Sequence, residues 1–158
     1  YFVKDILPLI YKERPDVEAV FVGRNAPPHI MSLNKVKGVK ITGAVDDVRP
    51  YMEEGDVYIV PLRIGGGTRL KILDALAMRK AVVSTSIGAE GLDLQEGKHL
   101  LIADTPERFA AKVLKLLEDP GLVESLGEAG RKQVEEKYGW DQLAAKLEKF
   151  VSSLVEGK

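Results

Sequence analysis

The chain has 158 residues, 45% of them apolar, which is enough material for one globular domain with its own core. Its 23 basic and 24 acidic residues leave a net charge of −1, which argues against nucleic-acid binding through a broad positive field and still allows a local phosphate site. The absence of cysteine excludes disulfides and thiolate metal sites. His29 and His99 lie far apart in sequence, so we expect no histidine metal site and interpret both as bystanders.

No apolar run approaches the roughly 20 residues of a membrane-spanning helix, so we expect no membrane span. We interpret the protein as cytoplasmic, with a peripheral membrane location of the full-length form left open. The chain begins at Tyr1, without an initiator methionine and already within a helical pattern. We therefore interpret residues 1–158 as one domain cut from a longer polypeptide.

Short apolar runs alternate with helical patterns along the whole chain. Each run is short and continuous, which is typical of a parallel sheet covered by helices on both faces, so the sequence predicts an α/β fold. We interpret Trp140, at the start of the last helix, as a packing anchor. The predicted elements are, in chain order, helix 1–14 (with Pro8 inside it), strand 18–23, helix 29–33, strand 39–42, helix 47–54, strand 56–61, helix 68–79, strand 81–85, loop 86–91, strand 100–103 and helices 106–119, 120–138 and 140–154.

Three consecutive glycines, 65–67, join the strand 56–61 to the helix 68–79. The first amides of a helix have no internal partner, and the helix dipole adds about half a positive charge there. Glycines carry no Cβ and let a phosphate approach the bare backbone, so strand, glycine turn and helix start together predict an anion site. The predicted ligands of the anion are Gly66, Gly67, Thr68, Arg69, Leu70 and Lys71, with Arg69 and Lys71 adding positive charge.

The stretch VYIVPLRIGGGTRLKILDALAMRKAVVSTSIGAEGL resembles the donor-binding signature of retaining glycosyltransferases with the two-domain GT-B fold, the group 1 (family 4) class. The resemblance also takes in VFVG, VKITGAVDDV and the late YGW, and so covers nearly the whole chain. It implies a Rossmann-like doubly wound parallel sheet, the C-terminal half of the GT-B fold. This half would hold a UDP- or GDP-type nucleotide sugar, while an N-terminal domain outside this chain would hold the acceptor. Residues 66–71 would then bind the phosphate and sugar oxygens of the donor, and the charges of Arg69 and Lys71 would stabilise the diphosphate as it departs.

Two positions depart from the family pattern, which has two glutamates separated by seven residues. Asp74 stands at the second of them and keeps a carboxylate, which the resemblance implies accepts hydrogen bonds from ribose hydroxyls. Gly66 stands at the first and cannot make the family's glutamate contact to the donor sugar. The resemblance further implies retention of anomeric configuration, no obligatory metal and no cofactor, and it leaves the catalytic residues unassigned.

The spacing along the chain supports the ribose role. Asp74 follows Thr68 by six residues, about 9 Å along a helix, which is comparable to the span from a diphosphate at the helix start to a ribose beside the helix. Ligands of open parallel sheets bind beyond the carboxyl ends of the strands. The predicted base pocket therefore comprises Gly23, Arg24, Gly43, Ala44 and Val45, which follow two of the predicted strands.

Simpler structural interpretations stay open for these residues. The glycines 65–67 can form an ordinary flexible turn, and Lys71 and Asp74 can be an exposed pair three residues apart on one helix face. Arg69 can be a solvated surface charge. Glu90, in the loop 86–91, is interpreted mainly as facing water, with contact to donor or acceptor as the alternative.

We predict a glycosyltransferase domain of the hexosyltransferase type that binds a nucleoside-diphosphate sugar. Residues 1–158 alone are expected to bind nucleotide weakly and to transfer no sugar, because the acceptor half is absent. Two alternatives stay open. One is a nucleotide-sugar epimerase of the same fold, and the other is a non-catalytic nucleotide-binding or scaffold module, for which Gly66 argues.

The first strand of the doubly wound sheet would precede Tyr1 and would be central in the strand order 3-2-1-4-5-6. The strands 18–23 and 56–60 would then face each other across a gap. They either close on each other, take up a segment of another chain, or expose sheet edges through which the fragment self-associates.

Overall fold

The computed structural model of the chain describes residues 1–156, so the last two residues of the predicted domain lie outside it. Its elements are, in chain order, the π-helix η1 (Phe2–Ile6), α1 (Leu7–Glu13), β1 (Ala19–Val22), α2 (Pro28–Met31), the 3-10 helix η2 (Ser32–Lys35), β2 (Val39–Gly43), α3 (Arg49–Glu54), β3 (Val57–Val60), α4 (Leu70–Ala77), β4 (Ala81–Ser84), α5 (Ser86–Ala89), β5 (Leu101–Ile102), α6 (Pro106–Glu118), α7 (Pro120–Tyr138) and α8 (Trp140–Glu156).

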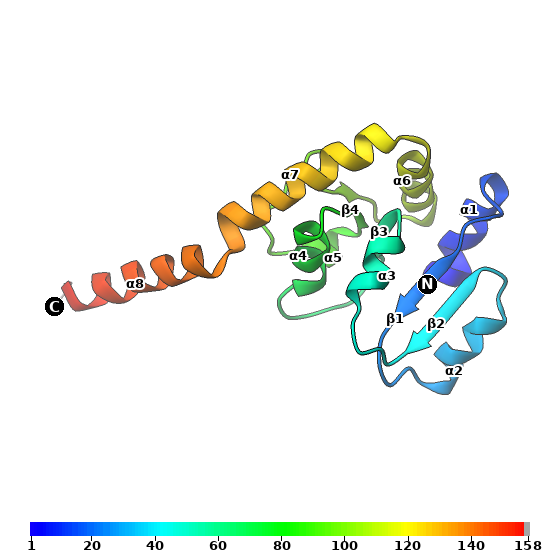
Figure 1. Cartoon of the computed structure of the whole chain (residues 1–158), viewed down its shortest axis with the longest axis horizontal. Helices are drawn as coiled ribbons and strands as arrows, with labels where there is room; N and C mark the ends of the chain where they lie inside the picture. Colours follow the sequence, from blue (N-terminus) through cyan, green and yellow to red (C-terminus); the bar gives the residue numbers. More distant parts are fainter. Residues whose placement is uncertain (157–158) are drawn as a thin grey trace.

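All the paired strands are parallel, as predicted, but they form two sheets instead of one (Figure 1). The first sheet pairs β1 with β2, with Ala19 opposite Val39. The second has the order β3-β4-β5, with Val57 opposite Ala81. The α/β class with parallel strands is therefore confirmed, whereas the strand pairing that would join the two sheets is absent from the described residues.

Helices cover both faces of the β3-β4-β5 sheet. All four residues of β4 are buried, and successive side chains of a strand point to opposite faces. Ala81 and Val83 lie in one apolar cluster with Phe109 of α6, while Val82 lies in a second cluster with Leu76 of α4. The apolar residues of β4 thus pack against helices on both faces of the sheet, as expected for a buried parallel strand.

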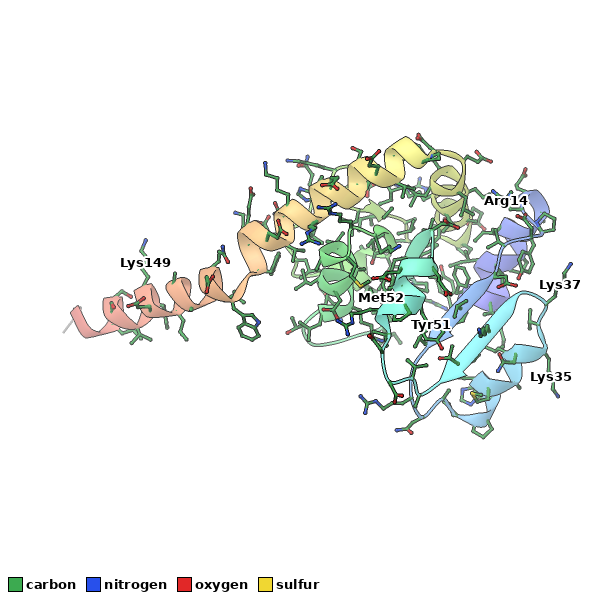
Figure 2. All side chains as sticks on the ribbon, in the orientation of Figure 1. Arg14, Lys35, Lys37, Tyr51, Met52 and Lys149 are labelled. Atoms are coloured by element: carbon green, nitrogen blue, oxygen red, sulfur yellow. The ribbon has the colours of Figure 1, made fainter. Side chains whose placement is uncertain are left out.

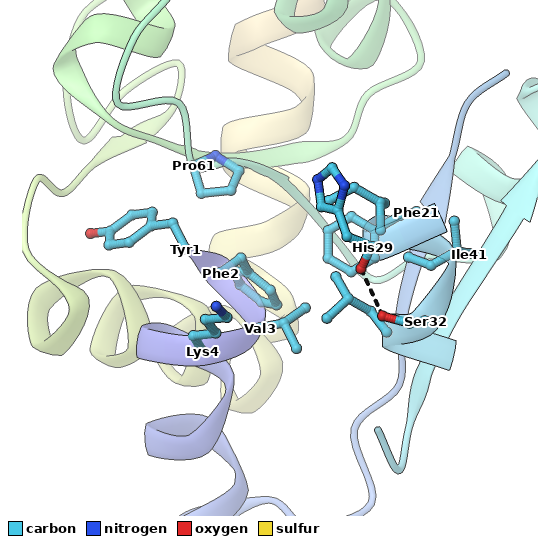
Figure 3. Close-up of a pocket in the computed structure, with 11 residues that line it drawn as sticks. Tyr1, Phe2, Val3, Lys4, Phe21, His29, Ser32, Ile41 and Pro61 are labelled. Atoms are coloured by element: carbon cyan, nitrogen blue, oxygen red, sulfur yellow. Dashed lines mark hydrogen bonds between the residues drawn. The ribbon is translucent and has the colours of Figure 1, made fainter. Parts of the chain in front are cut away.

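An apolar cleft of about 570 Å³ lies between the N-terminal residues 1–4 and the β1–β2 sheet with its helices α2 and η2 (Figure 3). Its lining includes Phe21 of β1 and Pro61, which follows β3. Phe2 packs edge-on against Phe21, with ring centroids 5.9 Å apart, and also against Phe109, at 6.3 Å. Packing of apolar side chains, with the Phe2 ring among them, and not strand pairing, therefore connects the β1–β2 sheet to the rest of the core. Closure of β1 on β3, one of the three predicted outcomes, is wrong, and self-association through these edges stays a prediction.

The N-terminal helix is present as predicted but starts as a π-helix. A proline inside an α-helix has no amide to donate, and its ring clashes with the carbonyl four residues earlier. The wider turn of η1 ends at Ile6, so that Pro8 falls in the first turn of α1, where proline is tolerated. The segment predicted as the loop 86–91 also differs, because its first four residues form the single turn of α5.

Helix α8 leaves the body of the molecule and extends away from it beyond α7 (Figure 1). Its large apolar side chains, among them Leu147 and Phe150, are exposed. Lys149 marks the position of the helix in Figure 2. Trp140 is 87% exposed, so its interpretation as a packing anchor is wrong. Within the described residues, no helix combines the length and the apolar character needed to cross a bilayer.

Candidate functional site

The glycine loop, residues 61–69, connects the end of β3 to the start of α4 at the carboxyl edge of the second sheet. Gly67 has a φ of +79°, a left-handed conformation that favours glycine, and Arg69 caps the helix with φ −81° and ψ 48°. These non-helical residues delay the start of α4 to Leu70, two positions later than predicted. Asp74 therefore lies one helical turn, about 6 Å, beyond the helix start.

A row of unpaired amides is the main chemical feature of this loop. Within the described part of the chain, no hydrogen bond takes up the main-chain amides of residues 66–71. The first amide of α4 with a partner is that of Ile72, which donates to the Arg69 carbonyl at 3.0 Å. Residues 66–68 and 70–71 are exposed, so this stretch of the chain lies at the surface. Six consecutive free donors at a helix start form an arrangement that binds anions.

The side chain of Arg69 turns inward and is only 7% exposed. Its Nη1 donates to the Gly66 carbonyl at 3.3 Å, and its Nη2 donates to the Gly65 carbonyl at 3.1 Å. Nη2 also donates to Oε2 of Glu90 at 3.2 Å. Arg69 is therefore not the solvated surface charge of the alternative interpretation. Glu90 is 72% exposed, so it faces water, as interpreted, and also pairs with Arg69.

The glycine loop is also tied to two other segments. The Thr85 hydroxyl donates to the Leu62 carbonyl and accepts from the Gly88 amide at 3.0 Å, which caps α5. The guanidinium of Arg63 lies 5.1 Å from the centre of the Tyr1 ring, a cation–π contact. Sequence reasoning missed the Thr85 contact, because the threonine signals a helix cap but nothing in the sequence links it to Leu62, 23 residues earlier.

Lys71 and Asp74 are both exposed on α4, as an ordinary helix pair would be. In the part of the chain that the structure describes, no ion pair joins them, and the Asp74 carboxylate accepts no hydrogen bond. Burial raises the pKa of Tyr58 on β3 above its usual value, and the negative charge of Asp74 raises it further. Asp74 therefore lies close enough to Tyr58 for its charge to act there, and its oxygens are available to a ligand.

The predicted base-pocket residues come together at the carboxyl edge of the β1–β2 sheet. The Gly23 amide donates to the Gly43 carbonyl at 3.2 Å, after a register shift between Phe21 and Val22. Gly43 has a φ of +76°, which turns the chain toward Ala44. The structure thus groups 23–24 with 43–45, on a different sheet from the glycine loop. None of the predicted binding residues lines the apolar cleft, whereas His29 does.

A family model described as glycosyl transferases group 1 matches residues 1–119 of the chain. The chain belongs to this family. It is 30% identical over 162 residues to the GDP-mannose-dependent alpha-(1-6)-phosphatidylinositol monomannoside mannosyltransferase of Mycobacterium tuberculosis, an alignment that covers 92% of the chain and 42% of that protein. The chain spans between 31% and 42% of the length of the curated relatives it matches.

Two solved structures show the fold of this family domain. The C-terminal domain of a glycosyl transferase group 1 protein from Francisella tularensis matches with a TM-score of 0.74 and 21% identity, over 88% of this chain and 78% of that one. The Anabaena protein HepE, solved in complex with UDP, matches with a TM-score of 0.80 and 16% identity, over 94% of this chain and 44% of that one. The fold is that of the C-terminal, Rossmann-like half of a GT-B glycosyltransferase, as the resemblance implied.

His99 is the one histidine of the family domain that is buried. Its Nδ1 accepts a hydrogen bond from the Gln95 amide at 3.0 Å, in the turn that precedes β5. Burial lowers the pKa of His99 below 6.5, the charge of Lys98 lowers it further, and Asp93 acts in the opposite direction. The ring supports the turn as a neutral acceptor, which agrees with its interpretation as a bystander to binding.

The stability of the domain should decrease as the pH is lowered, because of His99. A depressed pKa in the folded state means that the unfolded chain binds the proton more readily, so the contribution of His99 is complete above about pH 6.5 and is lost as the pH falls toward the folded-state pKa. Replacing His99 by asparagine keeps an acceptor and removes this titration. Urea denaturation between about pH 5 and 7.5 should therefore give a flatter stability profile for His99→Asn than for the wild type. His29→Asn, at an exposed position, is the control, and parallel profiles of wild type and His99→Asn would contradict the prediction.

Among the described residues, no three histidine, cysteine, aspartate or glutamate side chains gather in a way that would hold a metal ion. The expectation that no obligatory metal is needed stays a prediction. The candidate site therefore consists of main-chain amides, Lys71 and Asp74, with Arg69 and Glu90 behind the loop.

Proposed function

We propose that this chain is the donor-binding domain of a retaining glycosyltransferase that transfers a hexose-type sugar from a nucleoside diphosphate. The acceptor is bound by an N-terminal domain outside this chain. The observation that carries the proposal is the row of free amides at residues 66–71, in a chain that belongs to the glycosyl transferases group 1 family. Two names agree with such a donor: the mycobacterial relative is called GDP-mannose-dependent, and HepE has been solved with UDP-glucose.

The proposed roles follow from the chemistry of each group. The amides of residues 66–70 bind the diphosphate and sugar oxygens, and the Lys71 ammonium adds a positive charge that stabilises the diphosphate as it leaves. Asp74 accepts hydrogen bonds from the ribose hydroxyls. Gly23 and Arg24, together with 43–45, line the base pocket. Gly66 offers an amide but no side chain, so the contact of the family's first glutamate to the donor sugar is missing.

Titration of residues 1–158 with UDP and with GDP tests the proposal. We expect one of the two nucleotides to bind weakly, because this chain provides only one half of the cleft. The matching nucleoside, which lacks the diphosphate, should bind with an affinity at least about tenfold lower. Calorimetry or NMR titration measures both affinities. Equal affinity for nucleotide and nucleoside would contradict the anion site, and binding of neither nucleotide would favour the scaffold alternative.

We also expect no sugar transfer by residues 1–158 alone, because the other domain provides the acceptor-binding site and half of the cleft. Transfer by this piece would contradict that expectation. Conversion of UDP-N-acetylhexosamine to its epimer by the complete protein would favour the epimerase alternative.

A further inference from the structure

Arg69 is a buried cation whose guanidinium is held by three acceptors. Its guanidinium holds the carbonyls of Gly65 and Gly66 and the carboxylate of Glu90, at 3.1 to 3.3 Å. Its Nε is buried and has no hydrogen-bond partner among the described residues. The sequence suggested that Arg69 adds charge next to a phosphate, but a side chain that is 7% exposed and held by three acceptors is arranged for a different task.

We infer that Arg69 is a positioning residue: it holds two glycine carbonyls on the inner side of the loop so that the next two amides face solvent. Carbonyl and amide of one peptide group lie in a rigid plane and point in opposite directions when the bond is trans. The structure contains no cis peptide bond in the described residues. Holding the Gly65 carbonyl inward therefore turns the Gly66 amide outward, and holding the Gly66 carbonyl inward does the same for the Gly67 amide.

This constraint matters because the loop is built from glycine. Three consecutive glycines have the largest conformational freedom of any such stretch, and ordering them at the moment of binding weakens affinity. A loop already held by Arg69 loses less freedom when a diphosphate binds. The effect on nucleotide affinity rests on the function proposed above, whereas the effect on the loop itself does not.

The planar fork of arginine suits this task, and lysine does not. Nη1 and Nη2 reach two carbonyls and one carboxylate at once, while a single ammonium on a flexible stem has no matching fork. A Cβ added to Gly65 would lie 3.0 Å from Nη1, so glycine leaves the space that the guanidinium occupies. Glu90 is mostly exposed, and exposed ion pairs contribute little to stability. We therefore assign its contact the role of orienting the guanidinium toward the segment that follows α5.

Arg69→Lys tests the inference in the nucleotide-free domain. It keeps the charge and loses the fork, so the NMR order parameters of Gly65, Gly66 and Gly67 should fall from about 0.85, typical of rigid backbone, to below about 0.6. Glu90→Gln should lower them less. Lys71→Gln is the matched control, because it removes an exposed cation from the same site without touching the loop carbonyls. Unchanged order parameters in Arg69→Lys would overturn the inference.

Nucleotide titration separates a positioning role from direct contact. Arg69→Lys and Arg69→Gln should weaken binding of UDP or GDP about three- to tenfold while the salt dependence stays that of the wild type. Lys71→Gln should weaken binding and flatten the salt dependence, since it removes a charge that faces the phosphates. A flatter salt dependence in Arg69→Gln would show direct contact with the phosphates and overturn the inference.

If the wild type binds neither nucleotide but Arg69→Lys still lowers the order parameters of the loop, the proposed function fails and the positioning role stands. Urea denaturation checks that each variant is folded. If Arg69→Gln does not fold, the result for Arg69→Lys decides between positioning and direct contact.

Discussion

Replacing Asp74 by alanine should weaken binding of UDP or GDP, whichever the wild type prefers, about tenfold or more. A hydrogen bond to a charged group contributes about 1.5–3 kcal/mol, and 1.4 kcal/mol corresponds to a factor of ten. The variant also removes repulsion between the carboxylate and the diphosphate. That opposing effect is smaller. Two exposed charges about 8 Å apart interact by about 0.5 kcal/mol in water, and salt at about 0.15 M, where the Debye length is about 8 Å, reduces this to roughly a third for each charge of the diphosphate.

Two variants make the Asp74 measurement specific. Asp74→Glu restores the side chain of the family pattern and keeps the acceptor oxygens, so its affinity should stay within about threefold of the wild type. Glu124→Ala removes an exposed carboxylate from α7 and is the control for a general change in charge. An Asp74→Ala variant that binds nucleotide as tightly as Glu124→Ala would show that Asp74 does not hold the ribose.

Replacing Phe109 by alanine should lower the free energy of unfolding by about 3–5 kcal/mol. Phe109 is fully buried on α6, and its ring packs against that of Phe2 with a centroid distance of 6.3 Å. The variant loses the transfer free energy of the ring and leaves a cavity in the apolar cluster that both sheets share. Since a domain of this size is stable by only about 5–15 kcal/mol, a large part of its stability depends on this one side chain. Urea denaturation with a two-state fit measures the change.

Phe150→Ala is the matched control for Phe109→Ala. Phe150 lies on α8 and is 61% exposed, so its truncation should change the free energy of unfolding by no more than about 0.5 kcal/mol. Equal losses in the two variants would mean that Phe109 is not part of the central packing of the isolated domain.

Much of the local structure follows from patterns a few residues long. The strand β4 is a continuous apolar run, and α6 begins at Thr105-Pro106, where the threonine hydroxyl accepts from the Arg108 amide as an N-cap. The break at Pro120 likewise predicts that α6 ends before it and that α7 begins at it, as the structure shows. The predicted start of α4 at residue 68 is two residues early. A glycine turn indicates that a helix follows, but it does not show which residue first adopts helical backbone angles.

The α5 turn shows a signal that sequence reasoning did not use. Thr85 is a suitable N-cap, but Gly88 within the turn itself disfavours a helix when considered alone. In the folded chain, Asp104 accepts from both the Ser86 amide and its hydroxyl, at 2.7 and 2.9 Å. A partner 18 residues away thus stabilises a turn that the local sequence leaves undecided.

The sequence by itself determined the α/β class, the positions of the parallel strands, and the glycine loop ahead of a helix with Asp74 on it. Those features depend on hydrophobic periodicity, caps and turn residues, which act over a few positions. Only the tertiary structure decided that the strands form two sheets, that Arg69 turns inward to Glu90, and that α8 stands apart from the body. These depend on contacts between residues distant along the chain, and such contacts exist only once the helices and sheets have packed.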